Sequence, residues 1–193
     1  MKKIGLLGGT FDPIHIGHLL MARTAMEEMS LDRVIFIPSC VPPHKKSPTL
    51  FAAKDRIEMA KLAVAQVPEF DASDFEIKKG GKSYSVDTVR HFREIFPPPA
   101  QLYFIVGGDA VQELDTWKEI GELKKLCSFI SVNRPGYSRG KEKLKYHAVT
   151  MNGIEMSSTE IRKRILAGKS IQFLVPDAVL GYIKAKNLYR IRN

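Results

Sequence analysis

Two histidines spaced three residues apart, His15 and His18, are the side chains best suited to chemistry in this sequence. They end the stretch Gly-Gly-Thr-Phe-Asp-Pro-Ile-His-Ile-Gly-His, which spans residues 8–18. At this spacing both imidazoles lie on one face of a helical turn, and each ring can donate a hydrogen bond to a phosphate oxygen. A glycine turn that opens a helix adds backbone N–H groups that attract anions. The stretch therefore predicts a site for phosphate groups.

The glycines of this stretch refine the prediction. Gly8 and Gly9 would let a nucleotide approach the backbone, and Gly17 would leave room between the histidines for a flat base or ribose. The lysine of a P-loop and the spacing of a dinucleotide fingerprint are both absent. A zinc pair would need a third ligand, and no cysteine-rich or acidic cluster lies nearby in the sequence. A purely structural glycine turn with two surface histidines is the remaining alternative.

The composition is that of an ordinary globular protein. The chain has 193 residues, of which 44% are hydrophobic and 26% are charged, so we expect a single domain over residues 1–193. Cys40 and Cys127 form no CxxC pattern, which fits a reducing cytosol. The first apolar run is too short for a signal peptide, and no stretch predicts a membrane span. We therefore expect a cytoplasmic protein that does not bind a membrane.

The positive charge is concentrated in the last third of the chain. Residues 1–132 contain 17 Lys and Arg and 17 Asp and Glu, whereas residues 133–193 contain 13 and 4, which accounts for the net charge of +9. Such a basic end fits nucleic acid, an acidic membrane surface or a phosphate-rich small substrate, or is simply a solvated surface. Because aromatic residues are not interleaved with the cations, we expect no nucleic-acid partner.

The elements that must position these residues alternate between strands and helices. Apolar runs predict strands over residues 4–7, 34–37, 71–77, 102–106, 129–132 and 147–151. Helical spacing and caps predict helices over residues 19–29, 54–67, 83–96, 110–117, 120–126, 157–168 and 176–187. Ser83 or Ser85 would cap the third of these helices, and Ser157 would cap the sixth. This order predicts an α/β fold with a doubly wound, mostly parallel sheet.

Three polar motifs follow predicted strands, at residues 8–18, 107–109 and 133–136. The carboxyl ends of parallel strands meet at one edge of a sheet, so these motifs should converge there. The helix that opens at residues 157–162 could add its N-terminus to the same site. A cationic loop, residues 42–46, also follows a predicted strand, although a solvated loop explains it about as well.

In this order, the motifs resemble the bacterial nicotinate-nucleotide adenylyltransferases, members of the nucleotidyltransferase superfamily with a (T/H)xGH element. The resemblance covers nearly the whole chain and rests on GGTFDPIHIGH, PPHK, SYSVDT, GGD, Trp117, NRPG and SSTEIR. SSTxIR is shared with relatives that act on other nucleotides, whereas SYSVDT together with Trp117 points to a pyridine nucleotide. The short HIGH element also occurs in class I aminoacyl-tRNA synthetases. One departure is Gly108, where the family often has alanine or threonine.

The resemblance implies a Rossmann-like nucleotidyltransferase fold, with residues 157–193 as a C-terminal helical part. It implies transfer of the adenylyl group of ATP to nicotinate mononucleotide, giving deamido-NAD and pyrophosphate in NAD biosynthesis. Mg²⁺ would arrive with ATP, and no metal site formed by the protein alone is expected. The binding partners would be these small molecules, and the chain could also form a homo-oligomer. Two rivals are a sister enzyme that uses phosphopantetheine and a nucleotide- or RNA-binding module that has lost catalysis.

The resemblance also implies roles for individual residues. His15, His18 and Arg162 would be catalytic, with His18 at the α-phosphate, His15 along the phosphate chain and Arg162 on the β- and γ-phosphates. The ATP site would further contain Gly8, Gly9, Thr10, Phe11, Gly107, Asp109, Ser158 and Thr159. Of these, Asp109 would accept a hydrogen bond from a ribose hydroxyl. The nicotinate mononucleotide site would contain Tyr84, Ser85, Val86, Trp117, Lys45 and Arg134.

Overall fold

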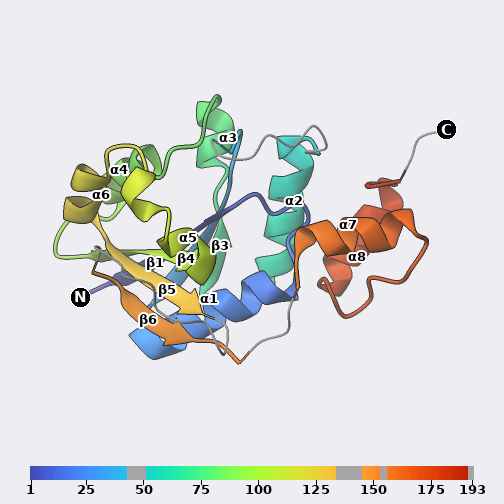
Figure 1. Ribbon diagram of the computed structural model, residues 1–193, viewed down its shortest axis with the longest axis horizontal. Helices are drawn as coiled ribbons and strands as arrows, with labels where there is room; N and C mark the ends of the chain where they lie inside the picture. The colour runs from blue at the N-terminus through green and yellow to red at the C-terminus, as the bar shows by residue number, and fades with distance from the viewer. Residues whose placement is uncertain (43–50, 134–144, 153–155, 191–193) are drawn as a thin grey trace.

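A six-stranded parallel sheet forms the centre of the computed structural model, which describes residues 1–42, 51–133, 145–152 and 156–190 (Figure 1). The strands are β1 (Lys3–Gly9), β2 (Arg33–Pro38), β3 (Phe70–Ala72), β4 (Gln101–Gly107), β5 (Ser128–Asn133) and β6 (His147–Thr150). Their order across the sheet is β3-β2-β1-β4-β5-β6, and every pair is parallel. The doubly wound, parallel sheet expected from the sequence is thus confirmed.

The strand order reverses between β1 and β4. From β1 the chain proceeds to β2 and β3 on one side, and then returns with β4, β5 and β6 on the other. In the register of these two strands Leu7 lies opposite Ile105, so both end at the same level. In open α/β sheets a ligand crevice forms outside the carboxyl ends of strands at such a reversal. The topology therefore predicts a ligand site at the carboxyl ends of β1 and β4.

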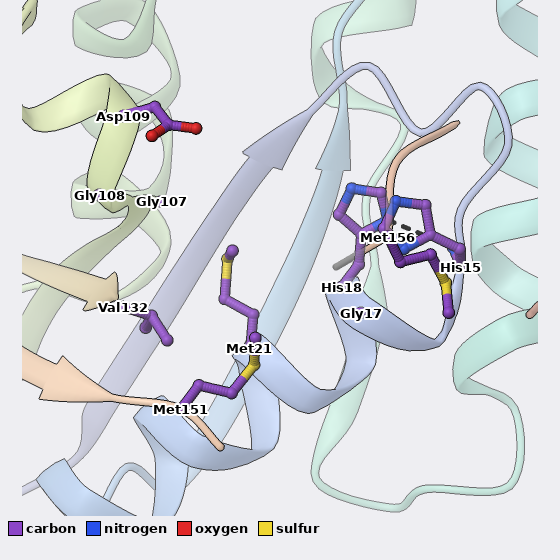
Figure 2. A pocket seen from close by; sticks show the side chains of 10 residues that line it. All are labelled: His15, Gly17, His18, Met21, Gly107, Gly108, Asp109, Val132, Met151 and Met156. Atoms are coloured by element: carbon purple, nitrogen blue, oxygen red, sulfur yellow. Dashed lines mark hydrogen bonds between the residues drawn. The ribbon is translucent and has the colours of Figure 1, made fainter. Parts of the chain in front are cut away.

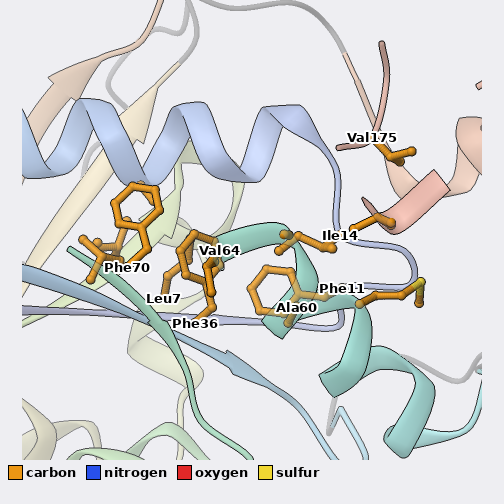
Figure 3. Packing of buried hydrophobic residues seen from close by; sticks show 14 of the residues in the cluster. Leu7, Phe11, Ile14, Phe36, Ala60, Val64, Phe70 and Val175 are labelled. Carbon is orange, nitrogen blue, oxygen red and sulfur yellow. The ribbon is translucent and has the colours of Figure 1, made fainter. Parts of the chain in front are cut away.

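One face of the sheet is covered by α1 (Ile16–Met29) and α2 (Ala53–Val64), with α7 (Ser158–Leu166) and α8 (Asp177–Ala185) beside α2 (Figure 1). Leu7 and Phe36 point to this face and pack with Ala60 and Val64 of α2 (Figure 3). Ile161 and Val179 extend the same hydrophobic cluster into the two C-terminal helices. This cluster therefore packs the C-terminal helices α7 and α8 against the same face of the sheet that α1 and α2 cover.

The opposite face packs against a second hydrophobic cluster. Its helices are α4 (Ser85–Ile95), α5 (Gly108–Val111), the 3-10 turn η1 (Leu114–Thr116) and α6 (Ile120–Leu126), with α3 (Phe75–Lys79) next to α4. Leu6 and Ile35, which neighbour Leu7 and Phe36 in sequence, point to this face. The alternation follows from the two-residue period of a strand. Both faces are thus buried, as is typical of a parallel sheet.

The strand expected over residues 71–77 is wrong beyond Ala72. Only Phe70–Ala72 pairs with β2, and Phe75–Lys79 forms the short helix α3. The helical turn buries Glu76, and Gly80 ends it with a φ of +74°. The alternation of polar and apolar residues could not distinguish three paired residues followed by one turn from a single strand, because both are short.

Two further expectations on helices need correction. Neither Ser83 nor Ser85 caps α4, since Tyr84 is its N-cap residue and makes no side-chain cap; the Ser83 hydroxyl instead accepts a hydrogen bond from the N–H of Cys40. The helix expected over residues 110–117 is divided into α5 and η1. The cap at Ser157 is confirmed, because its hydroxyl accepts from the N–H of Glu160.

No helix in the described part of the chain has both the length and the apolar character needed to cross a membrane.

Candidate active site

A cleft of about 870 Å³ opens at the carboxyl ends of β1 and β4. It collects Trp117 and residues from four of the predicted motifs: Gly8, Gly9, Thr10, His15, His18, Ser85, Gly107, Asp109, Ser158, Thr159 and Arg162. A smaller pocket of about 190 Å³ adjoins it and shares His15, His18, Gly107 and Asp109. The predicted convergence of the motifs at residues 8–18, 107–109 and 157–162 is therefore confirmed.

The two histidines occupy the start of α1. His15 is the N-cap residue and His18 lies in the first turn. Their rings stack with centroids 3.7 Å apart and planes inclined by 24° (Figure 2). This leaves no room for a base or ribose between them, so the expected role of Gly17 is wrong. A Cβ at Gly17 would lie 3.1 Å from the His15 ring, which shows that this glycine accommodates the imidazole.

One hydrogen bond determines which nitrogen of His18 carries a proton. The backbone N–H of His15 donates to Nδ1 of His18 at 3.2 Å. An acceptor nitrogen carries no hydrogen, so the neutral His18 ring must carry its proton on Nε2. The ring is also held from the side by Phe11, whose plane meets it at 85° with centroids 4.9 Å apart. His18 is thus a donor with a defined tautomer and orientation.

The segment between β1 and α1 is anchored in the core. The side chains of Phe11 and Ile14 are buried against α2 (Figure 3), so Phe11 can offer a ligand only its backbone. A Cβ at Gly9 would lie 2.8 Å from the Phe11 ring. The glycine turn is therefore required by the packing of this segment, whatever ligand approaches it.

The start of α7 lies against the same segment. The Ser158 hydroxyl donates to the Pro13 carbonyl at 2.9 Å. Arg162 donates from Nη1 to the Asp12 carbonyl at 2.6 Å and from Nη2 to the Thr159 hydroxyl at 3.2 Å. Arg162 is half-buried and lines the cleft. Its guanidinium has five N–H donors, so these bonds leave capacity for an anion while fixing the group next to the histidine loop.

Gly107 and Asp109 form the opposite wall. Gly107 ends β4 and precedes α5, and the exposed Asp109 side chain stands at the α5 side of the pocket, across from the imidazoles (Figure 2). Three methionines, Met21, Met151 and Met156, line the smaller pocket. An apolar recess edged by a carboxylate suits a flat base whose sugar hydroxyls face that carboxylate.

The predicted acceptor residues are brought together only in part. Ser85 and Trp117 line the cleft, and the Trp117 ring is held edge-on against Phe104 with centroids 5.7 Å apart. Val86 is buried in the core, and the Tyr84 ring lies under the ammonium of Lys118 at 4.6 Å. Tyr84 and Val86 can therefore contribute through the backbone at the start of α4. Lys45 and Arg134 lie outside the described residues.

Two charged residues escaped the sequence prediction, one buried behind the cleft and one in its lining. Arg56 is only 1% exposed and donates to the carbonyls of Phe51, Thr10, Ser39 and Cys40. Burial lowers its pKa, against the attraction of Asp12. A signal for Arg56 existed, since helical spacing places it on the apolar face of α2 with Ala60.

Glu76, the second of these residues, lines the cleft itself and is 7% exposed. Its carboxylate accepts a hydrogen bond from the Thr88 hydroxyl. Burial raises its pKa, while Ser83, Thr88 and Lys79 act in the opposite direction. No sequence signal could have found Glu76, because its position in the cleft depends on α3 replacing the expected strand.

Within the described ranges, no group of three or more His, Cys, Asp or Glu side chains is arranged to hold a metal ion.

Comparison with known proteins gives concordant matches. Residues 6–164 match the model of the cytidylyltransferase-like family. A probable nicotinate-nucleotide adenylyltransferase of Shouchella clausii is 44% identical over 193 residues and covers all of both chains. Another from Thermus thermophilus is 44% identical over 188 residues, covering 97% of this chain and 100% of the relative.

Solved structures agree at the level of the fold. The nicotinic acid mononucleotide adenylyltransferase of Plasmodium falciparum, solved in complexes with APC and with NaAD, superposes with a TM-score of 0.78 in both cases. Each superposition covers 98% of both chains at 19% and 20% identity, respectively. At such identities the match establishes the arrangement of the elements.

Proposed function

The chain belongs to the nicotinate-nucleotide adenylyltransferases, within the cytidylyltransferase-like family, and from this we propose that it transfers the adenylyl group of ATP to nicotinate mononucleotide in the cleft between β1 and β4. The products are deamido-NAD and pyrophosphate. The observation that carries the proposal is the convergence of the histidine pair, Asp109 and the start of α7 around that cleft.

The reaction forms one bond and breaks one bond at the α-phosphorus of ATP. An oxygen of the 5′-phosphate of nicotinate mononucleotide attacks, and the bond to the bridging oxygen of pyrophosphate breaks. The attacking phosphate is already an anion at neutral pH, so no general base is needed. Catalysis then consists of alignment and of neutralising negative charge.

His18 is the group proposed to meet the developing charge. We propose that its Nε2 proton is donated to a non-bridging oxygen of the α-phosphate, because Nδ1 accepts from the His15 N–H and the neutral ring therefore carries its proton on Nε2. The stack with His15 and the edge contact with Phe11 hold the ring in place. A donor fixed before the reaction needs no reorganisation as charge builds up. His15 would face the phosphate chain beside it.

The remaining ATP contacts follow the cleft. Thr10 and the N-terminus of α7, with Ser158 and Thr159, would hold the β- and γ-phosphates together with Arg162. The backbone at Gly8, Gly9 and Phe11 would approach the phosphates. Gly107 and Asp109 would contact the ribose, and the methionine-lined pocket would take the adenine. These assignments rest on the lining residues of the two pockets.

Nicotinate mononucleotide would occupy the part of the cleft between α4 and Trp117. The first N–H groups of a helix have no partner within the helix, and at Ser85 and Val86 they suit a carboxylate. Trp117 would supply a flat face for the pyridine ring. Lys45 and Arg134 are proposed as further contacts to the mononucleotide on the family pattern.

Magnesium is proposed to arrive with ATP. The hard oxygen ligands that Mg²⁺ prefers are present on the triphosphate itself. When bound there, the ion would neutralise charge on the phosphate oxygens. The protein's own contribution is to hold the triphosphate with N–H, hydroxyl and guanidinium donors.

The proposal is tested by incubating the purified chain with ATP and Mg²⁺ and one of three additions: nicotinate mononucleotide, phosphopantetheine or no acceptor. We expect pyrophosphate and deamido-NAD in equal amounts with nicotinate mononucleotide, and neither in the other two reactions. Equal pyrophosphate release with and without acceptor would overturn the proposal, as would adenylylation of phosphopantetheine in preference.

A further inference from the structure

The segment that carries the histidines has a strained backbone. Phe11, between the glycine turn and His15, has a φ of +49°. A residue with a side chain adopts this left-handed conformation only at a cost. Such a conformation persists where surrounding contacts impose it, and residues 10–15 make several such contacts.

Three of these contacts hold backbone carbonyls. Arg56 donates to Thr10 at 2.8 Å, Arg162 to Asp12 at 2.6 Å, and Ser158 to Pro13 at 2.9 Å. The donors come from α2 and from α7. Together they fix the path of the peptide, and each of these three hydrogen bonds ends on a backbone carbonyl.

The Asp12 carboxylate is held from the far end of the chain. The hydroxyl of Tyr189 donates to Oδ1 of Asp12 at 2.7 Å, across 177 residues of sequence. Asp12 is 2% exposed and Tyr189 is 4% exposed. A buried carboxylate needs both a counter-charge and hydrogen-bond donors. Arg56, 1% exposed and electrostatically coupled to Asp12, supplies the charge, and Tyr189 supplies a donor.

The backbone around Tyr189 is itself unusual. Tyr189 has a φ of +66° and Asn187 a φ of +49°, so the chain after α8 turns sharply to bury the tyrosine ring. The ring packs against Phe51 with centroids 4.3 Å apart. Burial and the neighbouring Asp12 raise the pKa of Tyr189, so its hydroxyl keeps its proton and donates at neutral pH.

We propose that Tyr189 is a positioning residue for the reaction. By holding the Asp12 carboxylate, its hydroxyl keeps the strained segment in the conformation that sets His15 and His18 on the cleft. This inference rests on the proposed function. It adds that the segment after α7 determines the alignment of the histidines, although none of its described residues, 167–190, lines the large cleft.

The rival explanation is that Tyr189 merely attaches the C-terminal end to the domain. The chain contains a matched control for this. Tyr182, in α8, donates its hydroxyl to Oδ1 of Asp55 in α2 at 2.8 Å. Both tyrosines therefore donate to an aspartate carboxylate, but Asp12 lies before α1 and lines the cleft, whereas Asp55 lies in α2 and does not.

The experiment compares Tyr189→Phe with Tyr182→Phe. Each substitution removes one oxygen and keeps the ring. We measure kcat, KM for both substrates and the melting temperature, at a temperature at which all three proteins are folded. We expect at least a ~tenfold fall in kcat for Tyr189→Phe, because small misplacements of reacting groups have such effects. The kcat of Tyr182→Phe should stay within twofold of the wild type. Equal kcat values for the two variants, high or low, would overturn the proposal.

A spectroscopic readout separates this inference from the proposed function. The imidazole NMR signals of His15 and His18, recorded without substrates, should move in Tyr189→Phe and remain in place in Tyr182→Phe. Unmoved signals would overturn the inference even if the enzyme is active. A wild-type chain that makes no deamido-NAD would instead contradict the proposed function, while the NMR comparison still tests the role of Tyr189.

A second variant applies if Tyr189→Phe does not fold. Asp12→Ala removes the same hydrogen bond from the acceptor side, and we expect a fall in kcat at least as large. An unchanged kcat would overturn the proposal. Where all the variants fold, the double variant Tyr189→Phe/Asp12→Ala provides a further test. Its kcat should be less than twofold below that of Asp12→Ala, because the effects of two substitutions that remove the same contact are not additive. Fully multiplicative effects would show that Tyr189 acts by another route.

Discussion

At the scale of single residues, the proton on Nε2 of His18 is the feature closest to the chemistry. Its location follows from a backbone donor, the His15 N–H, that occupies Nδ1. The same imidazole on a mobile surface loop would divide its proton between both nitrogens. The helix start thus provides more than a place for the ring, because it selects the tautomer that can donate into the cleft.

We expect His18→Ala to lower kcat by a factor of about 10² to 10³, the usual effect of removing one fixed donor to developing charge. His91→Ala is the control, since His91 stacks on Phe75 with centroids 3.9 Å apart and does not line the cleft. The measurement is steady-state turnover, with circular dichroism to verify the fold. If a folded His18→Ala protein turns over like His91→Ala, His18 has no catalytic role.

At the scale of elements, the site consists of helix starts placed around a strand reversal. α1 brings the histidines, α7 brings Ser158 and Arg162, and α4 brings Ser85. Each of these starts carries N–H groups that favour anions. The arrangement suits two substrates that are both phosphorylated, one of them also a carboxylate.

Arg162→Ala is expected to raise KM for ATP more than KM for nicotinate mononucleotide, and also to lower kcat. The first effect is the loss of a guanidinium at the triphosphate, and the second follows from its hydrogen bond to the Asp12 carbonyl. Arg164→Ala on the same helix is the control, since Arg164 bonds Ser170 away from the cleft. The measurement is steady-state kinetics with each substrate varied in turn. A rise in KM for nicotinate mononucleotide alone would contradict the assignment of Arg162 to ATP.

The start of α4 is expected to select nicotinate over nicotinamide mononucleotide by at least ~tenfold in kcat/KM. Backbone N–H groups satisfy a carboxylate, whereas a carboxamide presents its own donors to them. The ratio of the two kcat/KM values, measured at one ATP concentration, decides the matter. A ratio near one would mean that residues 84–86 do not bind the carboxylate.

Ser85→Pro tests the same point within the helix. Proline is tolerated at the first helical position but lacks the N–H, and Tyr84 before it is already extended. Ser85→Ala keeps the N–H and removes only the hydroxyl. The preference for nicotinate should therefore fall in Ser85→Pro and persist in Ser85→Ala. An equal change in both would assign the effect to the hydroxyl.

At the scale of the whole molecule, the cleft is built by contacts between distant parts of the chain. Residues near position 12 are held by residues 145 to 177 positions later. The lining of the cleft also includes a buried acid, Glu76, which belongs to α3 and accepts a hydrogen bond from Thr88 of α4. Lys79 and Asp87 act on it from these helices, and Arg56 acts on it from α2. Stability and site geometry are therefore linked.

Glu76 is expected to make the fold less stable as pH rises. Burial raises its pKa in the folded state, so the folded protein binds this proton more tightly than the unfolded chain, whose glutamate titrates at about 4.3. The contribution of Glu76 to the free energy of unfolding therefore decreases as pH rises from the unfolded pKa of about 4.3 through the folded pKa. Glu76→Gln removes the titration, so the stability of this variant relative to the wild type should increase as pH rises above about 4.3.

Urea unfolding of both proteins at several pH values provides the measurement. Glu94→Gln, a substitution of an exposed glutamate in α4, is the control and should follow the wild type at every pH. Parallel pH profiles for Glu76→Gln and the wild type would show that Glu76 is not held in an unfavourable charged state.

The sequence by itself determined the parts that depend on local pattern. Apolar runs identified β1, β2, β4 and β5, because a buried parallel strand has little room for polar residues. The eleven residues ending at His18 and the cap at Ser157 indicated two helix starts that line the cleft, and the order of the motifs along the chain indicated the family.

Only the tertiary structure decided the features that depend on distant neighbours. The stack of His15 on His18 depends on packing against Phe11, and the bonds from Arg162 and Tyr189 to Asp12 join opposite ends of the chain. α3 escaped prediction because a single turn has too few residues to show a helical period. Spacing can place two residues on one face of one element, but the contacts that align a site between elements arise when the sheet brings their ends together.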